Sequence, residues 1–250
     1  MEKKRFNQLL NRIDDCGKAE QLNQIILEVT REYGYQYYQF CLLIPMGLLQ
    51  CQIYLLSHSP DGWIKNYWEN KYMQEDPLVH LAMRQSRPFQ WRDLELTDKQ
   101  LPAQSVAIMA ARRERGMCDG VTFPLHGPNG SHGILSLSGG QDSELELADL
   151  PLLGILSSTI FCKANQLLNQ KASNLSERER ECLFWVSEGK TSWEVAKILG
   201  ITERTVNFHL NSAIRKTGCR NRYQTIAHSI SAGHLMPAMD RLTLATFMEI

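Results

Sequence analysis

Long apolar runs are missing from this sequence. Across its 250 residues, no uninterrupted apolar stretch reaches the roughly 18 residues that mark a membrane-spanning helix. Residues 1–15 alternate charged and apolar side chains, whereas a secretory signal peptide carries a continuous apolar block. We therefore expect a cytoplasmic protein without a membrane partner.

Closely spaced cysteines are also missing, although the chain contains seven cysteines and seven histidines. Zinc sites and redox couples use cysteines or histidines only a few residues apart, and here they are scattered. No serine lies in the Gly-x-Ser-x-Gly motif that marks the nucleophile of many hydrolases. We therefore expect reduced cysteines, no metal, no cofactor and no catalytic residues.

The net charge is zero, but the charges are unevenly distributed. Residues 1–172 contain 17 basic and 19 acidic side chains, whereas residues 173–236 contain nine basic and six acidic ones. Within the second segment, residues 201–222 contain five basic side chains and a single acid, Glu203. Since nucleic-acid-binding proteins gather Lys and Arg where they meet phosphates, residues 173–236 are the candidate DNA-binding segment.

Apolar periodicity predicts both helices and strands in residues 1–168. Spacings of three and four residues predict helices at 6–13, 20–33, 62–72, 77–85, 104–115 and 145–168, the last interrupted near Pro151. Short aromatic and branched runs predict strands at 37–44, 51–57, 121–126 and 132–138, with turns at 45–47 and 127–130. Hairpin-paired strands flanked by helices predict an α+β fold, an α/β/α sandwich around a central antiparallel sheet.

Residues 175–236 are predicted to form a separate all-α domain of four helices. Residues 169–174 are polar and read as a linker, and residues 237–250 form a tail to which the pattern assigns no role. Ser176, Thr191 and Thr202 stand where N-caps are needed, and the first two have a glutamate three residues later, which completes a capping box. A glycine turn at 200 separates the second and third of these helices.

Two short helices joined by a tight glycine turn have the geometry that places the second helix in the major groove of DNA. The outward face of the third helix is polar and basic, and Asn and Arg side chains can bind base edges through two hydrogen bonds. A helical bundle whose polar face only meets water explains the same pattern. The predicted DNA-binding residues are Lys190, Thr191, Ser192, Thr202, Arg204, Thr205, Asn207, Asn211, Arg215, Lys216 and Arg222.

Three runs in this segment closely resemble the DNA-binding domain of LuxR-type regulators: 175–183, 188–196 and 205–209. In the first half, the spacing of Trp63, Tyr67, Asp76-Pro77, Trp91 and Gly116 resembles the autoinducer-binding domain of quorum-sensing LuxR-type proteins. The resemblance implies a transcription factor that binds an N-acyl-homoserine lactone. It also implies a homodimer on palindromic promoter DNA, with RNA polymerase as a further partner.

The resemblance assigns ligand contacts to polar residues that also have ordinary structural explanations. It implies that Trp63 donates to the lactone carbonyl and that Trp91 packs against the ring, although both would otherwise be core tryptophans. Asp76, which is also a good helix N-cap before a proline, would accept from the amide N–H of the ligand. Tyr67 and Ser136 would donate to the acyl carbonyl.

Apolar strand residues are expected to surround the acyl chain, namely Cys41, Ile53, Leu55 and Ile134. Ser59 and Leu78 stand where many relatives have a tyrosine and a small or hydroxylated residue, so the acyl length and the oxidation at its third carbon stay open. Burial of the ligand would stabilise the folded state by mass action, and the helix at 145–168 would form the two-fold interface.

Two alternatives come from other functional classes. The chain could be an enzyme that hydrolyses the same signal, which a lactone ring-opening assay would detect. It could also be a partner protein that heterodimerises, or that binds DNA without a ligand, which gel shifts with and without lactone would distinguish from the regulator.

Overall fold

The computed structural model describes residues 3–47, 50–94, 101–127, 130–140, 145, 148–168, 175–232 and 235. The chain divides into two compact units, an N-terminal unit and a C-terminal unit, which we describe separately. The predicted linker at 169–174 and the tail at 237–250 lie outside the described residues. Among the helices that the structure describes, none is long and apolar enough to cross a bilayer.

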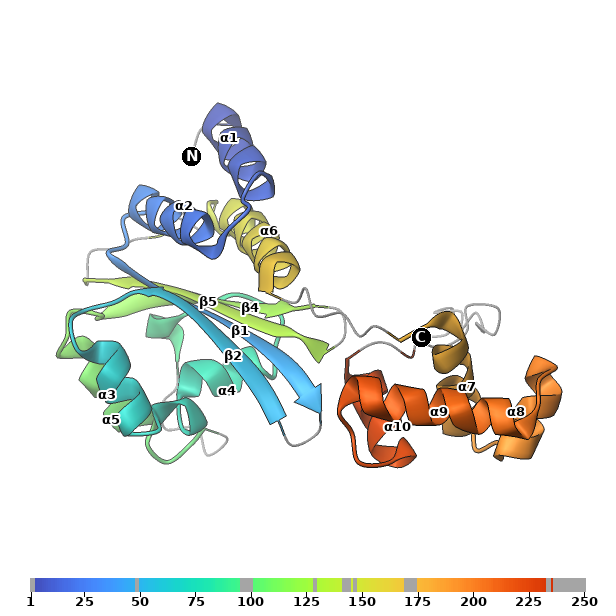
Figure 1. Ribbon diagram of the computed structural model, residues 1–250. Coiled ribbons are helices and arrows are strands. Elements are labelled where there is room, and N and C mark those ends of the chain that lie inside the picture. The colour runs from blue at the N-terminus through green and yellow to red at the C-terminus, as the bar shows by residue number, and fades with distance from the viewer. Residues whose placement is uncertain are drawn as a thin grey trace, which may run out of the picture. The chain divides into compact units, whose positions relative to one another are not determined.

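A five-stranded sheet with the order β2-β1-β5-β4-β3 forms the middle of the N-terminal unit (Figure 1). The neighbouring pairs β1–β5, β5–β4 and β4–β3 are antiparallel, which confirms the predicted antiparallel sheet. The strands are β1 (Tyr37–Gly47), β2 (Gln50–His58), β3 (Phe89–Gln90), β4 (Asp119–His126) and β5 (His132–Gly139).

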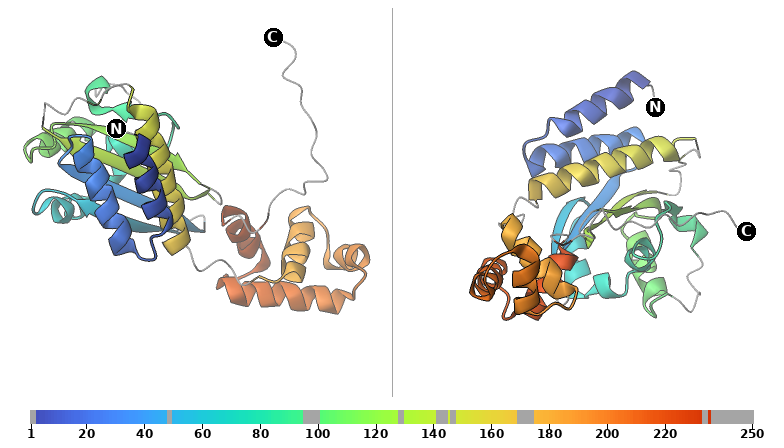
Figure 2. Two further views of the ribbon diagram at one scale, coloured as in Figure 1. Left: turned by 90° about the horizontal axis from the view of Figure 1, so that it is seen from above. Right: turned by 90° about the vertical axis from the view of Figure 1, so that its right-hand side faces the viewer.

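Helices cover both faces of the sheet, as Figures 1 and 2 show, which confirms the α/β/α sandwich. One layer contains α1 (Lys3–Asp14), α2 (Ala19–Glu32) and α6 (Leu150–Leu168). The opposite layer contains α3 (Trp63–Glu69), η1 (Tyr72–Gln74), α4 (Pro77–Ala82), η2 (Trp91–Asp93) and α5 (Ser105–Arg113).

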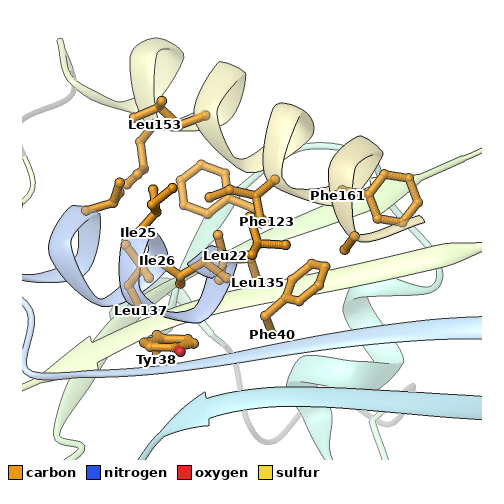
Figure 3. Packing of buried hydrophobic residues seen from close by; sticks show 14 of the residues in the cluster. Leu22, Ile25, Ile26, Tyr38, Phe40, Phe123, Leu135, Leu137, Leu153 and Phe161 are labelled. Carbon is orange, nitrogen blue, oxygen red and sulfur yellow. The ribbon is translucent and has the colours of Figure 1, made fainter. Parts of the chain in front are cut away.

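The main core lies between the sheet and the α2–α6 layer. Because successive strand residues point to opposite faces, Phe40, Phe123 and Leu135 all project toward α2 and α6, where they pack with Leu22 and Leu153 (Figure 3). These side chains are almost completely buried. The long apolar helices α2 and α6 therefore attach firmly to one face and leave the other face for different chemistry.

That second face, toward α3–α5, carries polar residues in one row across three strands. Ser136 of β5 is aligned with Gln39 of β1 on one side and with Thr122 of β4 on the other. The next row contains Cys41 and Ile134, which are also partners in the register. The period of two thus gives the same strands an apolar face and a partly polar face.

Two local predictions are corrected by the structure. The expected turn at 45–47 lies inside β1, which continues to Gly47. The pairing of β1 with β5 ends at Leu43, so the missing N–H of Pro45 costs no hydrogen bond on that side. The last helix of the unit begins at Leu150, and Pro151 lies in its first turn, where the helix needs no donor, instead of interrupting it.

The C-terminal unit contains the four predicted helices, and its apolar core includes Cys182, Leu183, Val195, Val206 and Leu210. The hydroxyls of the three predicted caps each accept a backbone N–H three residues later. Gly200 has φ +67°, a left-handed conformation that glycine adopts without strain. The helices are α7 (Glu177–Ser187), α8 (Ser192–Leu199), α9 (Glu203–Thr217) and α10 (Arg222–Ser231).

An ion pair with a buried carboxylate connects α7 to α9. The carboxylate of Glu179 is 4% exposed and lies 2.9 Å from Nζ of Lys216. Burial by itself raises the pKa of Glu179, but hydrogen bonds from Lys216 and from Ser212 outweigh it and lower that pKa to about 2. Glu179 therefore stays ionised and pairs with the exposed side chain of Lys216.

Gly120→Ala should destabilise the sheet. A Cβ at Gly120 would lie 2.4 Å from the carbonyl oxygen of Leu137 and 2.9 Å from Cε2 of Trp91, so backbone or indole must shift, at a cost of about 1 to 3 kcal/mol. Gly140→Ala is the control, because among the described residues nothing lies within 4 Å of that position. Equal thermal unfolding midpoints for the two variants would contradict the prediction.

Glu179→Gln should lower stability in a pH-dependent way. Glutamine can still form the capping box, so the change removes mainly the charge that pairs with Lys216. Because the folded pKa of about 2 lies below the ordinary value of 4.5, this contribution is present above pH 4.5 and is lost as the pH falls toward 2.

We expect a loss of about 1 to 3 kcal/mol at pH 7 that shrinks in acid, measured by urea unfolding. Glu177→Gln, on the exposed side of the same first turn, is the control. A pH-independent difference between these two variants would show that the ion pair contributes nothing.

Candidate ligand and nucleic-acid sites

A small cavity lies between the polar face of the sheet and the helices α3–α5. It encloses about 30 Å³, which is room for about two water molecules, so an acylated ligand would enter only if lining side chains move. Among the predicted ligand residues, the cavity wall includes Cys41, Leu55, Tyr67, Asp76, Leu78, Ile134 and Ser136.

The other four predicted ligand residues, Trp63, Trp91, Ser59 and Ile53, do not line this cavity. Trp63 is completely buried, and its ring centroid lies 5.7 Å from that of Tyr67. Ile53 is half-buried on β2, two residues before Leu55, and therefore on the same face of the sheet. Trp63 and Ile53 thus lie next to residues that line the cavity, and Trp91 is connected to the lining residue Ser136 through Thr122.

Asp76 caps α4 and also accepts hydrogen bonds from Tyr67 and Arg112. Its Oδ1 accepts from the backbone N–H of Leu78 at 3.0 Å, which caps α4. Its Oδ2 accepts from the hydroxyl of Tyr67 at 2.7 Å. Arg112 adds two further bonds, from Nη1 to Oδ1 at 3.3 Å and from Nη2 to Oδ2 at 2.7 Å. In this arrangement the hydroxyl of Tyr67 donates to Asp76, whereas the resemblance assigned it to the ligand.

Arg112 is the functional candidate that the sequence analysis missed. It is 2% exposed, and its guanidinium carbon lies 5.3, 5.8 and 5.5 Å from the ring centroids of Trp63, Tyr67 and Trp91, within cation–π range. Burial alone lowers its pKa, but the charge of Asp76 outweighs this and raises the pKa above its ordinary value. Its position four residues after the apolar Ile108 could have indicated this, because residues four apart lie on the same face of a helix, and Ile108 is buried.

The indole N–H of Trp63 is buried and has no hydrogen-bond acceptor among the described residues. An unpaired buried donor costs about 1 to 3 kcal/mol, so such groups are uncommon in folded proteins. The indole of Trp91 differs, because it donates to the hydroxyl of Thr122 at 2.9 Å, which in turn lies 2.9 Å from the hydroxyl of Ser136. Of these two tryptophans, Trp63 is therefore the one whose indole N–H has no acceptor among the described residues.

Cys41 lines the cavity as a neutral thiol. Burial raises the pKa of Cys41 to about 12, so it remains protonated and contributes apolar surface. Within the described parts of the chain, no group of three or more His, Cys, Asp or Glu side chains is arranged to hold a metal ion.

The second candidate site is the surface formed by α8 and α9. Most of the predicted DNA-binding side chains on these helices and at their ends are exposed, namely Lys190, Thr191, Thr202, Arg204, Asn207, Asn211, Arg215 and Lys216, and Arg222 is exposed at the start of α10. Thr205 is half-buried, and its hydroxyl lies 2.8 Å from that of Thr202. The ammonium of Lys216 forms an ion pair with Glu179.

Ser192 and Asn207 form a hydrogen bond between the two helices. Ser192 is almost buried at 9% exposure, and its hydroxyl donates to Oδ1 of Asn207 at 2.8 Å. This bond orients the exposed amide of Asn207. It involves only the amide oxygen, so the NH₂ group does not contact Ser192. Ser192 therefore positions a neighbour, while Asn207 presents donors at the surface.

Comparisons with known proteins match a separate domain family to each of the two units. The autoinducer binding domain family matches residues 18–164, and the bacterial regulatory proteins of the luxR family match residues 173–229. The chain is 38% identical over 258 residues to the transcriptional activator protein AhyR of Aeromonas hydrophila, an alignment that covers 100% of this chain and 99% of AhyR.

Two solved structures of SdiA are similar over nearly the whole chain. The crystal structure of Escherichia coli SdiA has a TM-score of 0.81 at 26% identity and covers 93% of this chain and 98% of SdiA. SdiA in complex with octanoyl-rac-glycerol has a TM-score of 0.79 at 27% identity and covers 93% and 97%. An autoinducer-binding domain joined to a helix-turn-helix domain makes this protein a ligand-responsive DNA-binding regulator. The chain belongs to the LuxR family of transcriptional regulators.

Proposed function

We propose that the N-terminal unit binds an N-acyl-homoserine lactone and that α9 of the C-terminal unit binds promoter DNA. The observation that carries the ligand proposal is the buried indole N–H of Trp63, which has no acceptor among the described residues. A lactone carbonyl is a matching acceptor, and binding would remove the cost of the unpaired donor.

The acyl chain would extend along the sheet. Cys41, Leu55, Leu78 and Ile134 supply apolar wall to the cavity, with Ile53 and Ser59 close by. Complexed SdiA, which has a similar fold, holds octanoyl-rac-glycerol, and this supports an acyl chain as the apolar part of the ligand. Because the cavity is only about 30 Å³, side chains such as Met73 and the 42% exposed Trp68 would have to move outward.

A ligand that becomes buried in this way stabilises the folded state by mass action. Occupancy would then raise the amount of DNA-binding protein. We further propose a homodimer on palindromic DNA, because most homo-oligomers are two-fold symmetric and helix-turn-helix dimers bind paired half-sites. We also propose that the protein is cytoplasmic and that it contacts RNA polymerase.

The DNA contacts divide into two classes. Arg204, Arg215, Lys190 and Arg222 are exposed cations around α9 and would neutralise phosphates. Asn207, together with Asn211, would bind base edges, because a side-chain amide matches the donor and acceptor pair of adenine. Thr191, Ser192, Thr202 and Thr205 would support these contacts from the ends of α8 and α9, and Lys216 would contribute charge near the phosphates while paired with Glu179.

Trp63→Phe should weaken binding of N-octanoyl-homoserine lactone by about 1 to 3 kcal/mol, because the phenyl ring keeps the packing but removes the donor. Isothermal titration of the full chain measures the loss. Trp193→Phe is the matched control, since Trp193 is 55% exposed on α8, in the other unit. Equal affinities for the two variants would refute the role of Trp63, and an absence of binding in the unmodified protein would refute the ligand proposal itself.

Asn207→Ala should reduce discrimination between operator and random DNA by about 1 to 3 kcal/mol. Ser192→Ala removes the orienting hydrogen bond but leaves the amide, so it should cost less. Lys190→Ala should weaken both DNAs equally. Gel shifts with and without lactone measure all three, and equal losses on both DNAs for Asn207→Ala would exclude it from base recognition.

A further inference from the structure

Gln39 lines the cavity from the middle of the sheet, and none of the ligand contacts proposed above uses its amide. We propose that Gln39 is a specificity-determining residue that forms a hydrogen bond with an oxygen on the third carbon of the acyl chain. The preferred ligands would then be 3-oxoacyl- or 3-hydroxyacyl-homoserine lactones instead of saturated ones. This inference rests on the proposed function and names its ligand class more closely.

The first step of the argument is the position of Gln39 in the sheet. Strand β1 lies between β2 and β5 (Figure 1), and Gln39 of β1 is aligned with Ser136 of β5. Both side chains line the cavity, and so does Leu55 of β2. Gln39 therefore stands on the strand between the serine expected to donate to the acyl carbonyl and the apolar wall that β2 supplies to the acyl chain.

The second step is the reach of the side chain. Neighbouring strands lie about 4.8 Å apart, and aligned residues on one face have Cβ atoms about 5 Å apart. The side chain of glutamine is longer than that of serine, and the third carbon of an acyl chain is only two bonds beyond its carbonyl carbon. An acyl carbonyl that binds Ser136, with its chain directed toward Leu55, thus brings the third carbon within reach of the Gln39 amide.

The third step is the set of partners that the polar groups of the cavity wall already have. Tyr67 and Arg112 both donate to Asp76, and the hydroxyl of Ser136 has a hydroxyl partner on β4. By contrast, none of the hydrogen bonds among the described residues involves the side-chain amide of Gln39, which is half-buried. Its donor and its acceptor are therefore both open to a ligand.

The fourth step is the effect of ligand burial on this amide. A saturated acyl chain would displace water from Gln39 without replacing its hydrogen bonds, and a buried amide without a partner costs free energy. A 3-oxo group accepts from Nε2, and a 3-hydroxyl group can donate to Oε1. The neighbouring wall residues Leu55 and Ile134 have no polar side-chain atom, and the thiol of Cys41 is only a weak donor. Gln39 is thus the wall residue that would distinguish an oxygenated chain from a saturated one.

A matched pair of ligands tests this directly. N-octanoyl-homoserine lactone and N-(3-oxo-octanoyl)-homoserine lactone have the same ring, amide and chain length, and differ only at the third carbon. We expect the full-length protein to bind the 3-oxo ligand about tenfold more tightly, which corresponds to about 1.4 kcal/mol, measured by isothermal titration. A preference of less than about threefold, or a preference for the saturated ligand, would overturn the proposal.

Gln39→Met attributes the preference to Gln39. Methionine has an unbranched side chain of similar length but cannot donate to a carbonyl, so the preference should fall below about threefold. Gln36→Met is the matched control, because Gln36 is exposed directly before β1 and should keep the ratio of the unmodified protein. The ratio of the two ligands is compared within each variant, so any loss of folded protein affects both ligands alike.

If Gln39→Met keeps the preference, the proposal is overturned even where the unmodified protein prefers the 3-oxo ligand. An equal loss of affinity for both ligands would then show that Gln39 binds a group that the two share. Gln39→Leu removes the amide in the same way and takes the place of Gln39→Met should that variant fail to fold. Binding of neither lactone to the unmodified protein would refute the proposed function, an outcome distinct from binding without a preference.

Discussion

The buried ion pair between Asp76 and Arg112 is the interaction on which the ligand side of the N-terminal unit depends. Asp76 caps α4 and Arg112 lies on α5, so the pair joins two short helices on the same side of the sheet. Loss of either partner would leave the other as an unpaired buried charge, at a cost of about 3 to 5 kcal/mol. The same pair occupies both oxygens of the Asp76 carboxylate, which lines the cavity.

One face of the sheet packs in the main core, and the other face lines the cavity. On β5, Leu135 and Leu137 enter the main core, while Ile134 and Ser136, which alternate with them, face the cavity. The core face is closed by the long helices α2 and α6, whereas α3 and α4 contain only seven and six residues. Short elements with few buried contacts open at lower free energy than long ones. A rigid sheet with a looser helical cover is thus suited to a cavity that must enlarge to accept a ligand.

The C-terminal unit uses polar contacts to orient its surface helix. The Ser192–Asn207 hydrogen bond joins α8 to α9, and the Glu179–Lys216 ion pair joins α7 to α9. Both contacts lie within the unit and fix the rotation of α9 about its axis, which determines the side chains that it exposes. The exposed amides and guanidinium groups of α9 are therefore presented by a framework of capped helices around a small apolar core.

The sequence by itself determined the features that depend on neighbours along the chain. Apolar spacing predicted α2, and hydroxyl caps with a glycine at 200 predicted α7, α8 and α9, because caps and turns act within a few residues. Two short strand patterns with a turn signal between them predicted the β4–β5 hairpin. The sequence also supplied Trp63, Asp76 and Tyr67 as one group of candidates, through their resemblance to a known spacing.

Only the tertiary structure decided where β1 ends and what surrounds Asp76. Whether the strand ends before Pro45 depends on how far it pairs with β5, and the residues around Pro45 do not indicate this. Arg112 lies 36 positions after Asp76, among arginines that look like an ordinary basic helix end. A charge can be buried only where a distant partner and distant aromatic rings meet it, so its role follows from the fold and not from the residues beside it.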